Sequence, residues 1–167
     1  PYTFRHSSGV AMYACAIGEQ LGFGPAELVR TRRAALLHDI GKLGVSNAIL
    51  DKPGALTADE WQVMRAHTHH SYEILEAVPV FAELADDAAA HHERLDGRGY
   101  HRGLSGAALS PSARVLAVAD VTDALRSDRP YRAGLSVERV AAMLEEDAAA
   151  GKLCAQSVDA MVQVLRA

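Results

Sequence analysis

Residues 115–121 read VLAVADV, a nearly unbroken apolar run that contains a single carboxylate, Asp120. A helix that is apolar on all sides is buried in a globular protein. A buried carboxylate costs roughly several kcal/mol unless a cation or a metal ion compensates it. The basic residues of this stretch, Arg114 and Arg126, lie six positions away on either side, so neither shares the helix face of Asp120. The run therefore predicts a buried helix whose charge needs a partner, and a metal ion is an economical one.

The rest of the chain reads as a series of helices, because apolar residues recur at helical spacing and no stretch alternates apolar and polar residues as strands do. A capping box of Thr57 and Glu60 marks the start of one helix. Residues 93–112 hold four glycines and are expected to form one long loop. The sequence therefore predicts an all-α fold, a compact helical bundle of about seven helices, with one extra helical turn at 47–50. The expected helices cover residues 4–21, 25–39, 57–77, 79–92, 111–125, a segment that begins at Ser136, and 155–165.

The composition is that of an ordinary globular protein. The chain has 167 residues, about one domain, and is 49% hydrophobic and 23% charged, which excludes wholesale disorder. No apolar run approaches the ~20 residues that a membrane-spanning helix needs. The net charge of −4 gives no support to a broad basic face for DNA or RNA.

The cysteines and the first residue bear on the origin of the chain. Cys15 and Cys154 lie far apart and form no CxxC pair, which fits a reducing cytoplasm. The chain starts at Pro1 and no secretory leader follows. We therefore expect a single cytoplasmic catalytic domain, residues 1–167, excised from a longer protein with an upstream regulatory region.

Eight histidines are many for this length, and several stand in apolar surroundings. His38 and Asp39 follow an apolar helix, and His67 shares its helix face with Met64 and Ile74. One such histidine is ordinarily a hydrogen-bonded core residue. Several together with carboxylates favour a transition metal, because an all-oxygen magnesium or calcium site would not use imidazoles. Two ions fit the ligand count, and a two-metal centre polarises a phosphoryl group and supplies a hydroxide nucleophile.

Several short motifs also carry a family resemblance. The string HDIGK at 38–42 resembles the signature of the HD-superfamily metal-dependent phosphohydrolases. The chain more specifically resembles the HD-GYP subfamily, the bacterial cyclic di-GMP phosphodiesterases, in the order of its motifs and over nearly its whole length. The matching stretches are KPGxLT at 52–57, HHER at 91–94, DGxGY at 96–100, Ala119-Asp120, and RPYR at 129–132.

The resemblance implies roles for individual residues. The implied metal ligands are His6 before the HD pair, the central His38 and Asp39, the second-metal histidines His67, His91 and His92, and the late aspartate Asp120. Asp39 would bridge two divalent transition metal ions, with iron or manganese expected ahead of zinc, nickel or cobalt. Asp39 and Lys42 would be the catalytic residues, with Lys42 holding a substrate phosphate. Tyr100 would stand by a guanine or line the site entrance, and Arg129 and Arg132 would reach the phosphates or the base.

Some positions depart from the subfamily's pattern. His101 stands where the Gly-Tyr-Pro motif has proline, Ser71 where a glycine is usual, and Thr122 where an aromatic residue is usual. Tyr2 stands where some relatives carry a glutamate that binds a third metal, which favours two metals here. His69 and His70 match no ligand position and are expected on the surface, as is the loop residue His101.

The resemblance implies a metal-dependent phosphodiesterase that hydrolyses cyclic di-GMP to pGpG or GMP. Two alternatives stay open. One is an HD hydrolase of another phosphoester or cyclic nucleotide, and the other is a non-catalytic nucleotide-binding or docking module in signalling. The expected partners are the cyclic dinucleotide, an upstream sensor domain or a diguanylate cyclase, and a second copy of the chain in a homodimer.

Overall fold

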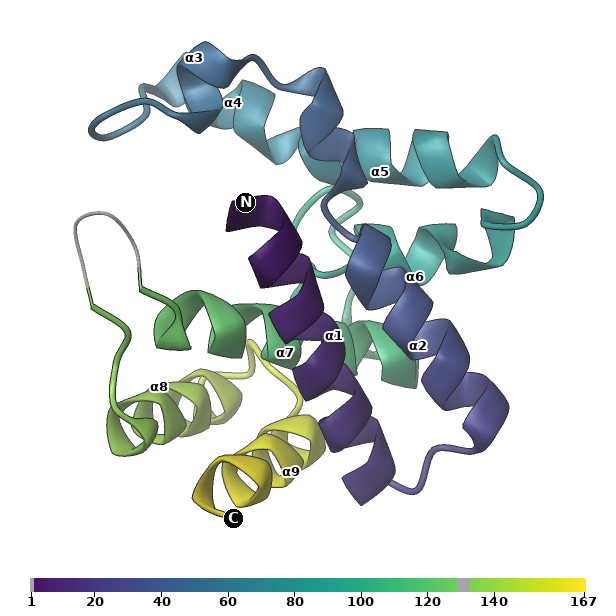
Figure 1. The fold of residues 1–167 in the computed structure, drawn as a ribbon, viewed down its shortest axis with the longest axis vertical. Coiled ribbons are helices and arrows are strands. Elements are labelled where there is room, and N and C mark those ends of the chain that lie inside the picture. Colours follow the sequence, from purple (N-terminus) through teal and green to yellow (C-terminus); the bar gives the residue numbers. More distant parts are fainter. Residues whose placement is uncertain (1, 129–132) are drawn as a thin grey trace.

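The computed structural model describes residues 2–128 and 133–167, and every regular element within these ranges is a helix (Figure 1). The expected all-α class is therefore confirmed. The α-helices are α1 (Tyr2–Gln20), α2 (Pro25–Leu37), α3 (Asn47–Leu50), α4 (Ala58–Arg65), α5 (His67–Glu76), α6 (Ala85–Ala89), α7 (Pro111–Arg126), α8 (Val137–Ala149) and α9 (Ala155–Arg166). The short 3-10 helices are η1 (Ile40–Gly44), η2 (Ala82–Leu84) and η3 (Gly106–Ala108).

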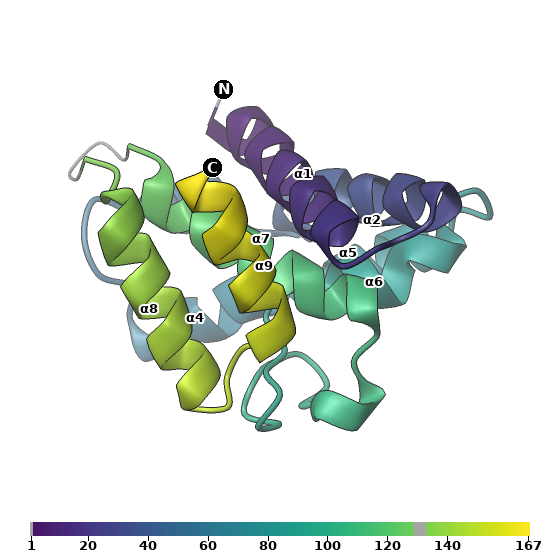
Figure 2. The same cartoon turned by 90° about the horizontal axis from the view of Figure 1, so that it is seen from below.

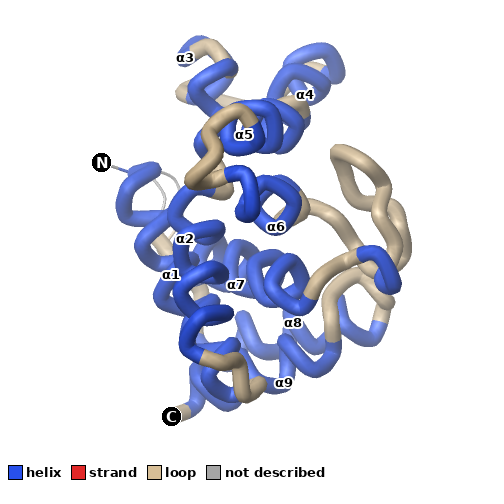
Figure 3. The backbone as a smooth tube through the Cα atoms, turned by 90° about the vertical axis from the view of Figure 1, so that its right-hand side faces the viewer, coloured by secondary structure: helices blue, strands red, loops and turns tan. Residues whose placement is uncertain are grey.

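Helix α7 runs through the middle of the bundle and is buried on most of its surface. Val115, Leu116 and Val118 are fully buried, and Asp120 is only 7% exposed. Figure 3 shows α6 on one side of α7 and α8 and α9 on the other, and α1 packs along it as well. Each fully buried valine or leucine contributes roughly 1.5–3 kcal/mol of hydrophobic free energy. The predicted buried helix is thus the element around which the core assembles.

The remaining helices form two groups around this core. Helices α8 and α9 pack against each other and against α7, as the view from below shows (Figure 2). Helices α3, α4 and α5 lie across one end of the bundle (Figure 1), and α5 packs on η1 and α6. The polar centre described below lies between α5 and the core helices α1 and α7.

The expected helix over 57–77 is divided in the structure. Its capping box is present, because Thr57 Oγ1 accepts a hydrogen bond from Glu60 N and Glu60 Oε2 accepts one from Thr57 N. The break falls at Ala66, where ψ is −14°, so α4 does not continue into α5. His67 therefore occupies the first position of a new helix rather than the middle of a long one.

The expected helix over 79–92 is shorter in the structure, where only η2 and α6 are helical. Helix α6 ends directly before Ala90, which takes φ −88° and ψ 3° and accepts a hydrogen bond from Glu93 N in a tight turn. This turn carries His91 and His92. Helical periodicity does not reveal such a turn, because alanine and histidine are compatible with a helix and with a turn.

Neither cysteine forms a disulfide bond. Cys15 and Cys154 are free thiols, as the sequence predicts. Among the described residues, no helix combines the length and the hydropathy that crossing a bilayer requires.

Candidate metal centre

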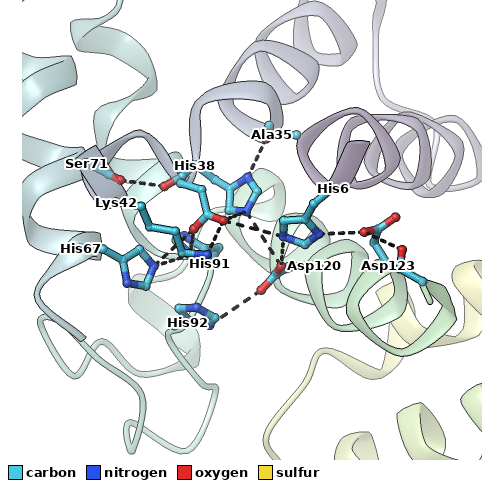
Figure 4. A network of polar contacts seen from close by, with 12 residues as sticks. His6, Ala35, His38, Lys42, His67, Ser71, His91, His92, Asp120 and Asp123 are labelled. Carbon is cyan, nitrogen blue, oxygen red and sulfur yellow. Dashed lines mark hydrogen bonds and ion pairs between the residues drawn. The ribbon is translucent and has the colours of Figure 1, made fainter. Parts of the chain in front are cut away.

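Imidazole and carboxylate side chains from five separate parts of the chain meet in one place (Figure 4). They come from α1, the turn after α2, the start of α5, the turn after α6, and the middle of α7. In that order they are His6, His38 with Asp39, His67, His91 with His92, and Asp120. All are buried except His92, which is partly buried. The fold thus brings together every residue that the sequence predicted as a metal ligand.

Asp39 lies between two groups of histidines and turns one carboxylate oxygen toward each. Its Oδ2 atom is 3.4 Å from His38 Nε2 and 3.8 Å from His6 Nε2. Its Oδ1 atom is 3.4 Å from His67 Nε2 and 3.8 Å from His91 Nε2. A carboxylate in this position can contact two different cations at once.

The two groups each have the composition of a metal site. In the first, the ligand atoms of His6, His38 and Asp120 lie within 4.8 Å of one another, and His6 Nε2 is 3.1 Å from Asp120 Oδ1. In the second, the ligand atoms of His67, His91 and His92 also lie within 4.8 Å of one another. Nitrogen and oxygen donors of this kind suit divalent transition metals.

Backbone carbonyls orient three of the imidazoles. The Nδ1 atoms of His38, His67 and His91 each donate to the carbonyl oxygen three residues earlier, at 2.7, 2.6 and 2.7 Å. When Nδ1 carries the hydrogen, Nε2 presents a lone pair. The Nε2 atoms of His67 and His91 lie 3.2 Å apart, so their lone pairs repel each other unless a cation lies between them.

Two buried polar atoms of the centre, His38 Nε2 and Asp39 Oδ1, have no hydrogen-bond partner in the part of the chain that the structure describes. Buried polar atoms in proteins nearly always have a partner, because desolvation without one is costly. Both atoms point into the groups described above. A metal ion would satisfy them, so the residues present fit the divalent metals that the sequence implied.

Asp123 contacts His6 on the side of the ring that faces away from the metal centre. The residue was not predicted from the sequence as part of the site. His6 Nδ1 donates to Asp123 Oδ2 at 2.7 Å, while Nε2 of the same ring faces Asp120. The spacing of three between Asp120 and Asp123 places both carboxylates on one face of α7, which is the signal that could have revealed it. Gly9 permits the contact, because a Cβ atom there would collide with the Asp123 carboxylate.

Burial keeps the second group of imidazoles neutral. It lowers the pKa of His67 to about 4 and also lowers the pKa values of His91 and His92. Neutral imidazole is the form that binds a metal. Near pH 7 these histidines are therefore already neutral, and a cation can bind them without displacing a proton.

The first group is charged. Burial alone would raise the pKa values of Asp39 and Asp120, but His38 beside the former and His6 beside the latter hold both well below their usual range. Burial alone would lower the pKa of His6, yet its hydrogen bonds with Asp120 and Asp123 raise it to about 9. Without metal, His6 therefore carries a proton at pH 7 that a cation must displace.

Lys42 lies at the edge of the centre, where its Nζ donates to Asp39 Oδ2 at 2.6 Å. A cavity of about 370 Å³ adjoins this pair, with Asp39, Lys42 and Ser7 among its lining residues. An ammonium group here can reach an anion that occupies the cavity. The other cations expected at the substrate, Arg129 and Arg132, fall outside the described residues.

Ser71, a departure from the subfamily's pattern, joins the turn that carries His38 to α5. Its Oγ accepts a hydrogen bond from Gly41 N at 2.9 Å and donates one to His38 O at 2.7 Å. Gly41 is needed for this close approach, because a Cβ atom there would collide with the His67 carbonyl. The glycine of the HDIGK string thus sets the distance between two of the histidine-bearing segments.

The glycine-rich loop places Tyr100 beside the centre. Tyr100 N donates to His92 O at 3.2 Å, and the two ring centroids are 4.9 Å apart. On α4, the Arg65 guanidinium carbon lies 5.2 Å from the centroid of the Tyr100 ring. Tyr100 therefore lies between His92 of the metal centre and Arg65 of α4.

Glu93 holds the backbone of the same loop. In the sequence it is one residue of the HHER motif, and nothing there predicts this role. The residue is 3% exposed, and its carboxylate accepts hydrogen bonds from the backbone N–H groups of Arg102, Gly103 and Leu104 at 2.7, 3.1 and 3.0 Å. These partners lie nine to eleven residues further on. No local pattern could have revealed them.

The remaining residues that differ from the HD-GYP pattern, together with the surface histidines, lie outside the two groups of metal ligands. The expectation that His101 lies on the surface is wrong, because the residue is half-buried. Its ring centroid is 5.2 Å from that of His69 and 6.1 Å from that of Tyr72. His69 and His70 lie on the outer face of α5, where both approach Glu73, as expected for surface residues. Thr122 is buried in α7 and donates to a carbonyl one turn earlier in its own helix.

Comparisons with known proteins agree with this architecture. The family model described as HD domain matches residues 1–153. The 3′3′-cGAMP-specific phosphodiesterase 3 of Vibrio cholerae is 50% identical over 147 residues, which cover 88% of this chain and 32% of that protein. The cyclic di-GMP phosphodiesterase of Thermotoga maritima is 39% identical over 158 residues, which cover 93% of this chain and 42% of that protein. The chain thus spans less than half the length of these relatives.

Among solved structures, an HDG"Y"P protein of Bdellovibrio bacteriovorus matches 99% of this chain and 53% of its own, with a TM-score of 0.81 and 20% identity. At this identity the likeness shows the fold. The HD domain model, in contrast, is a match of sequence and covers most of the chain. The chain therefore belongs to the HD-domain family, and its resemblance to the HD-GYP subfamily is confirmed.

Proposed function

We propose that this domain is a phosphodiesterase that hydrolyses cyclic di-GMP to pGpG or GMP at a two-metal centre. The observation that carries the proposal is the position of Asp39, whose two oxygens face two adjoining groups of ligands. A ligand atom of Asp39 also lies within 4.8 Å of those of His38 and His91, one from each group. Asp39 and the two groups of ligands would hold two divalent ions, and a pair of such ions is the usual apparatus for cleaving phosphoesters. Imidazole and carboxylate donors suit divalent transition metals in general, and among these the resemblance to the HD-GYP subfamily favours iron or manganese ahead of zinc, nickel or cobalt.

Each ion has a distinct ligand set in this proposal. One would be held by His6, His38, Asp120 and Asp39 Oδ2, and the other by His67, His91, His92 and Asp39 Oδ1. The buried and otherwise unpartnered His38 Nε2 and Asp39 Oδ1 support this division, because each atom would gain a cation.

Bound metal ions supply Lewis acidity toward a phosphate and lower the pKa of water. The side chains of this domain position the substrate and compensate its charge. Lys42 would offset the negative charge that develops on the phosphoryl oxygens, since its ammonium group lies beside Asp39 and lines the adjoining cavity. Tyr100, held at the entrance by its hydrogen bond to His92, would contact a base.

A second candidate substrate is 3′3′-cGAMP. The Vibrio cholerae relative that is 50% identical carries this compound in its name, whereas the Thermotoga maritima relative carries cyclic di-GMP. The two dinucleotides share their phosphodiester chemistry and differ in one base. The metal centre therefore does not distinguish them, and residues that contact the bases must do so.

The test is hydrolysis of both dinucleotides by the purified domain loaded with manganese, or with iron under anaerobic conditions. We expect turnover of cyclic di-GMP that is lost in Asp39→Ala and kept in Asp159→Asn, an exposed carboxylate on α9. Faster turnover of 3′3′-cGAMP would favour the second candidate. Absence of turnover with about two metal ions bound per chain would contradict the proposal and support a nucleotide-binding or docking module. The sensor, cyclase and homodimer partners remain predictions.

A further inference from the structure

Arg65, at the end of α4, is an exposed arginine beside the metal centre. Its guanidinium carbon lies 5.2 Å from the Tyr100 ring centroid, and that ring lies 4.9 Å from the ring of His92. Arg65, Tyr100 and His92 thus form a row, named here the rim stack, that leads outward from the second histidine group.

The guanidinium of Arg65 is not committed to a carboxylate. Two arginines of the nearby loop are each paired with one, Arg94 with Asp96 and Arg102 with Asp86. Within residues 2–128 and 133–167, no Asp or Glu oxygen forms an ion pair with Arg65. Its N–H groups are therefore available to an anion from solution.

The rim stack is anchored at the end nearest the metal centre. The Tyr100 backbone is bonded to His92 O, and Gly99 lies so close to the backbone of Glu93 that a Cβ atom there would collide with it. An arginine stacked on an aromatic ring keeps the edge of its planar guanidinium open, and that edge binds phosphate oxygens in pairs. Tyr100 therefore holds the Arg65 guanidinium on the side of the metal centre where His92 lies.

A cyclic dinucleotide has two phosphodiester groups on opposite sides of one macrocycle, and only one of them can occupy the metal centre at a time. We propose that Arg65 binds the second phosphodiester, the one that is not being cleaved, and thereby makes the site selective for substrates with two phosphates. The inference rests on the proposed function, since it assumes a cyclic dinucleotide as substrate.

The experiment compares two substrates in the metal-loaded domain. One is cyclic di-GMP, or 3′3′-cGAMP if that is turned over faster, and the other is bis(p-nitrophenyl) phosphate, which has a single phosphodiester. In Arg65→Gln we expect KM for the dinucleotide to rise about tenfold, as for one lost charge-assisted hydrogen bond. We expect kcat/KM for bis(p-nitrophenyl) phosphate to stay within about twofold.

Three further variants sharpen the result. Arg65→Lys keeps the charge without the planar fork and should recover part of the loss. Tyr100→Leu removes the ring under Arg65, so Arg65→Gln should cost less affinity in the Tyr100→Leu background than in the parent domain. Arg139→Gln changes the net charge equally on α8, where the arginine is exposed, and should leave both substrates unaffected.

The outcomes separate this inference from the proposed function. Equal losses with both substrates, or no change with either, would overturn the role of Arg65 while the phosphodiesterase stands. A parent domain that cleaves bis(p-nitrophenyl) phosphate but neither dinucleotide would overturn the proposed substrate and this inference together.

Discussion

The imidazole of His6 is held between two carboxylates of α7, with Nδ1 2.7 Å from Asp123 Oδ2 and Nε2 3.1 Å from Asp120 Oδ1. Asp120 faces the candidate metal position and Asp123 faces away from it. A carboxylate behind a metal-binding histidine fixes the ring's orientation and increases its basicity. This relationship joins the first helix of the chain to the buried α7.

Replacing Asp123 with Asn keeps the shape of the side chain and removes its charge. We expect the affinity for manganese to fall by about 10–100-fold, as is typical when a partner behind a metal ligand is changed. Titration against a chromophoric chelator measures this. Asp159→Asn on the exposed face of α9 makes the same change in charge and should leave the affinity unaltered. Equal affinities for all three proteins would show that Asp123 has no such role.

Gly41→Ala tests the close approach between η1 and α5. The added methyl group would collide with the His67 carbonyl and the Ser71 amide, and backbone cannot yield as a flexible side chain can. We expect the free energy of unfolding to drop by roughly 1–3 kcal/mol or more, together with weaker metal binding. Urea denaturation measures the first effect. Gly24→Ala is the matched control, because a Cβ atom there meets open space. A Gly41 variant as stable as the Gly24 variant would contradict the packing described.

Much of the centre could be predicted from the sequence, because its ligands stand out chemically. Asp120 is a lone carboxylate in an apolar run, and the HDIGK string at 38–42 places an imidazole and a carboxylate after an apolar helix. Charged or polar groups in such surroundings require partners. The burial of α7 follows from its apolar sequence, and the need of Asp120 for a cation follows from that burial. The roles of His6, His91 and His92 came only from the resemblance to the HD-GYP subfamily.

The supporting residues could not be predicted, because their partners are distant or belong to the backbone. Asp123 needs the packing of α1 on α7 to meet His6, and Glu93 binds amides in the following loop. The helix breaks at Ala66 and Ala90 depend on single backbone angles in otherwise helix-compatible sequence. Hydrophobic periodicity identifies helices well and their ends poorly.

The metal-free domain should lose stability on mild acidification. The pKa of His67 is about 4 in the folded protein and 6.5 in its ordinary state, so between these values the unfolded chain binds the proton more readily. The contribution of His67, on the order of 3 kcal/mol, is complete above pH 6.5 and disappears as the pH falls through 4. His6, whose pKa is raised to about 9, contributes fully below pH 6.5 and does not oppose this trend.

Urea unfolding in the presence of a chelator, between pH 7 and 4, measures that dependence. His67→Gln removes one titrating group and should give a shallower decline. A parent protein whose stability is constant from pH 6.5 to 4.5 would contradict the neutral state assigned to these buried imidazoles.

Glu93→Gln should loosen the loop that carries Tyr100 while leaving the metal ligands in place. The amide group cannot accept all three backbone hydrogen bonds that the carboxylate accepts. We expect faster hydrogen exchange at residues 102–104, a free energy of unfolding lower by about 1–3 kcal/mol, and normal metal content. Glu145→Gln, on the exposed face of α8, is the control. Loss of metal from the Glu93 variant would instead connect the loop to the centre itself.

Anomalous diffraction from a crystal of the manganese-loaded domain measures the proposed centre most directly. We predict two anomalous peaks, one on each side of the Asp39 carboxylate. The first should lie among His6, His38 and Asp120, and the second among His67, His91 and His92. A single peak, or two peaks that Asp39 does not join, would contradict a two-metal centre bridged by this residue.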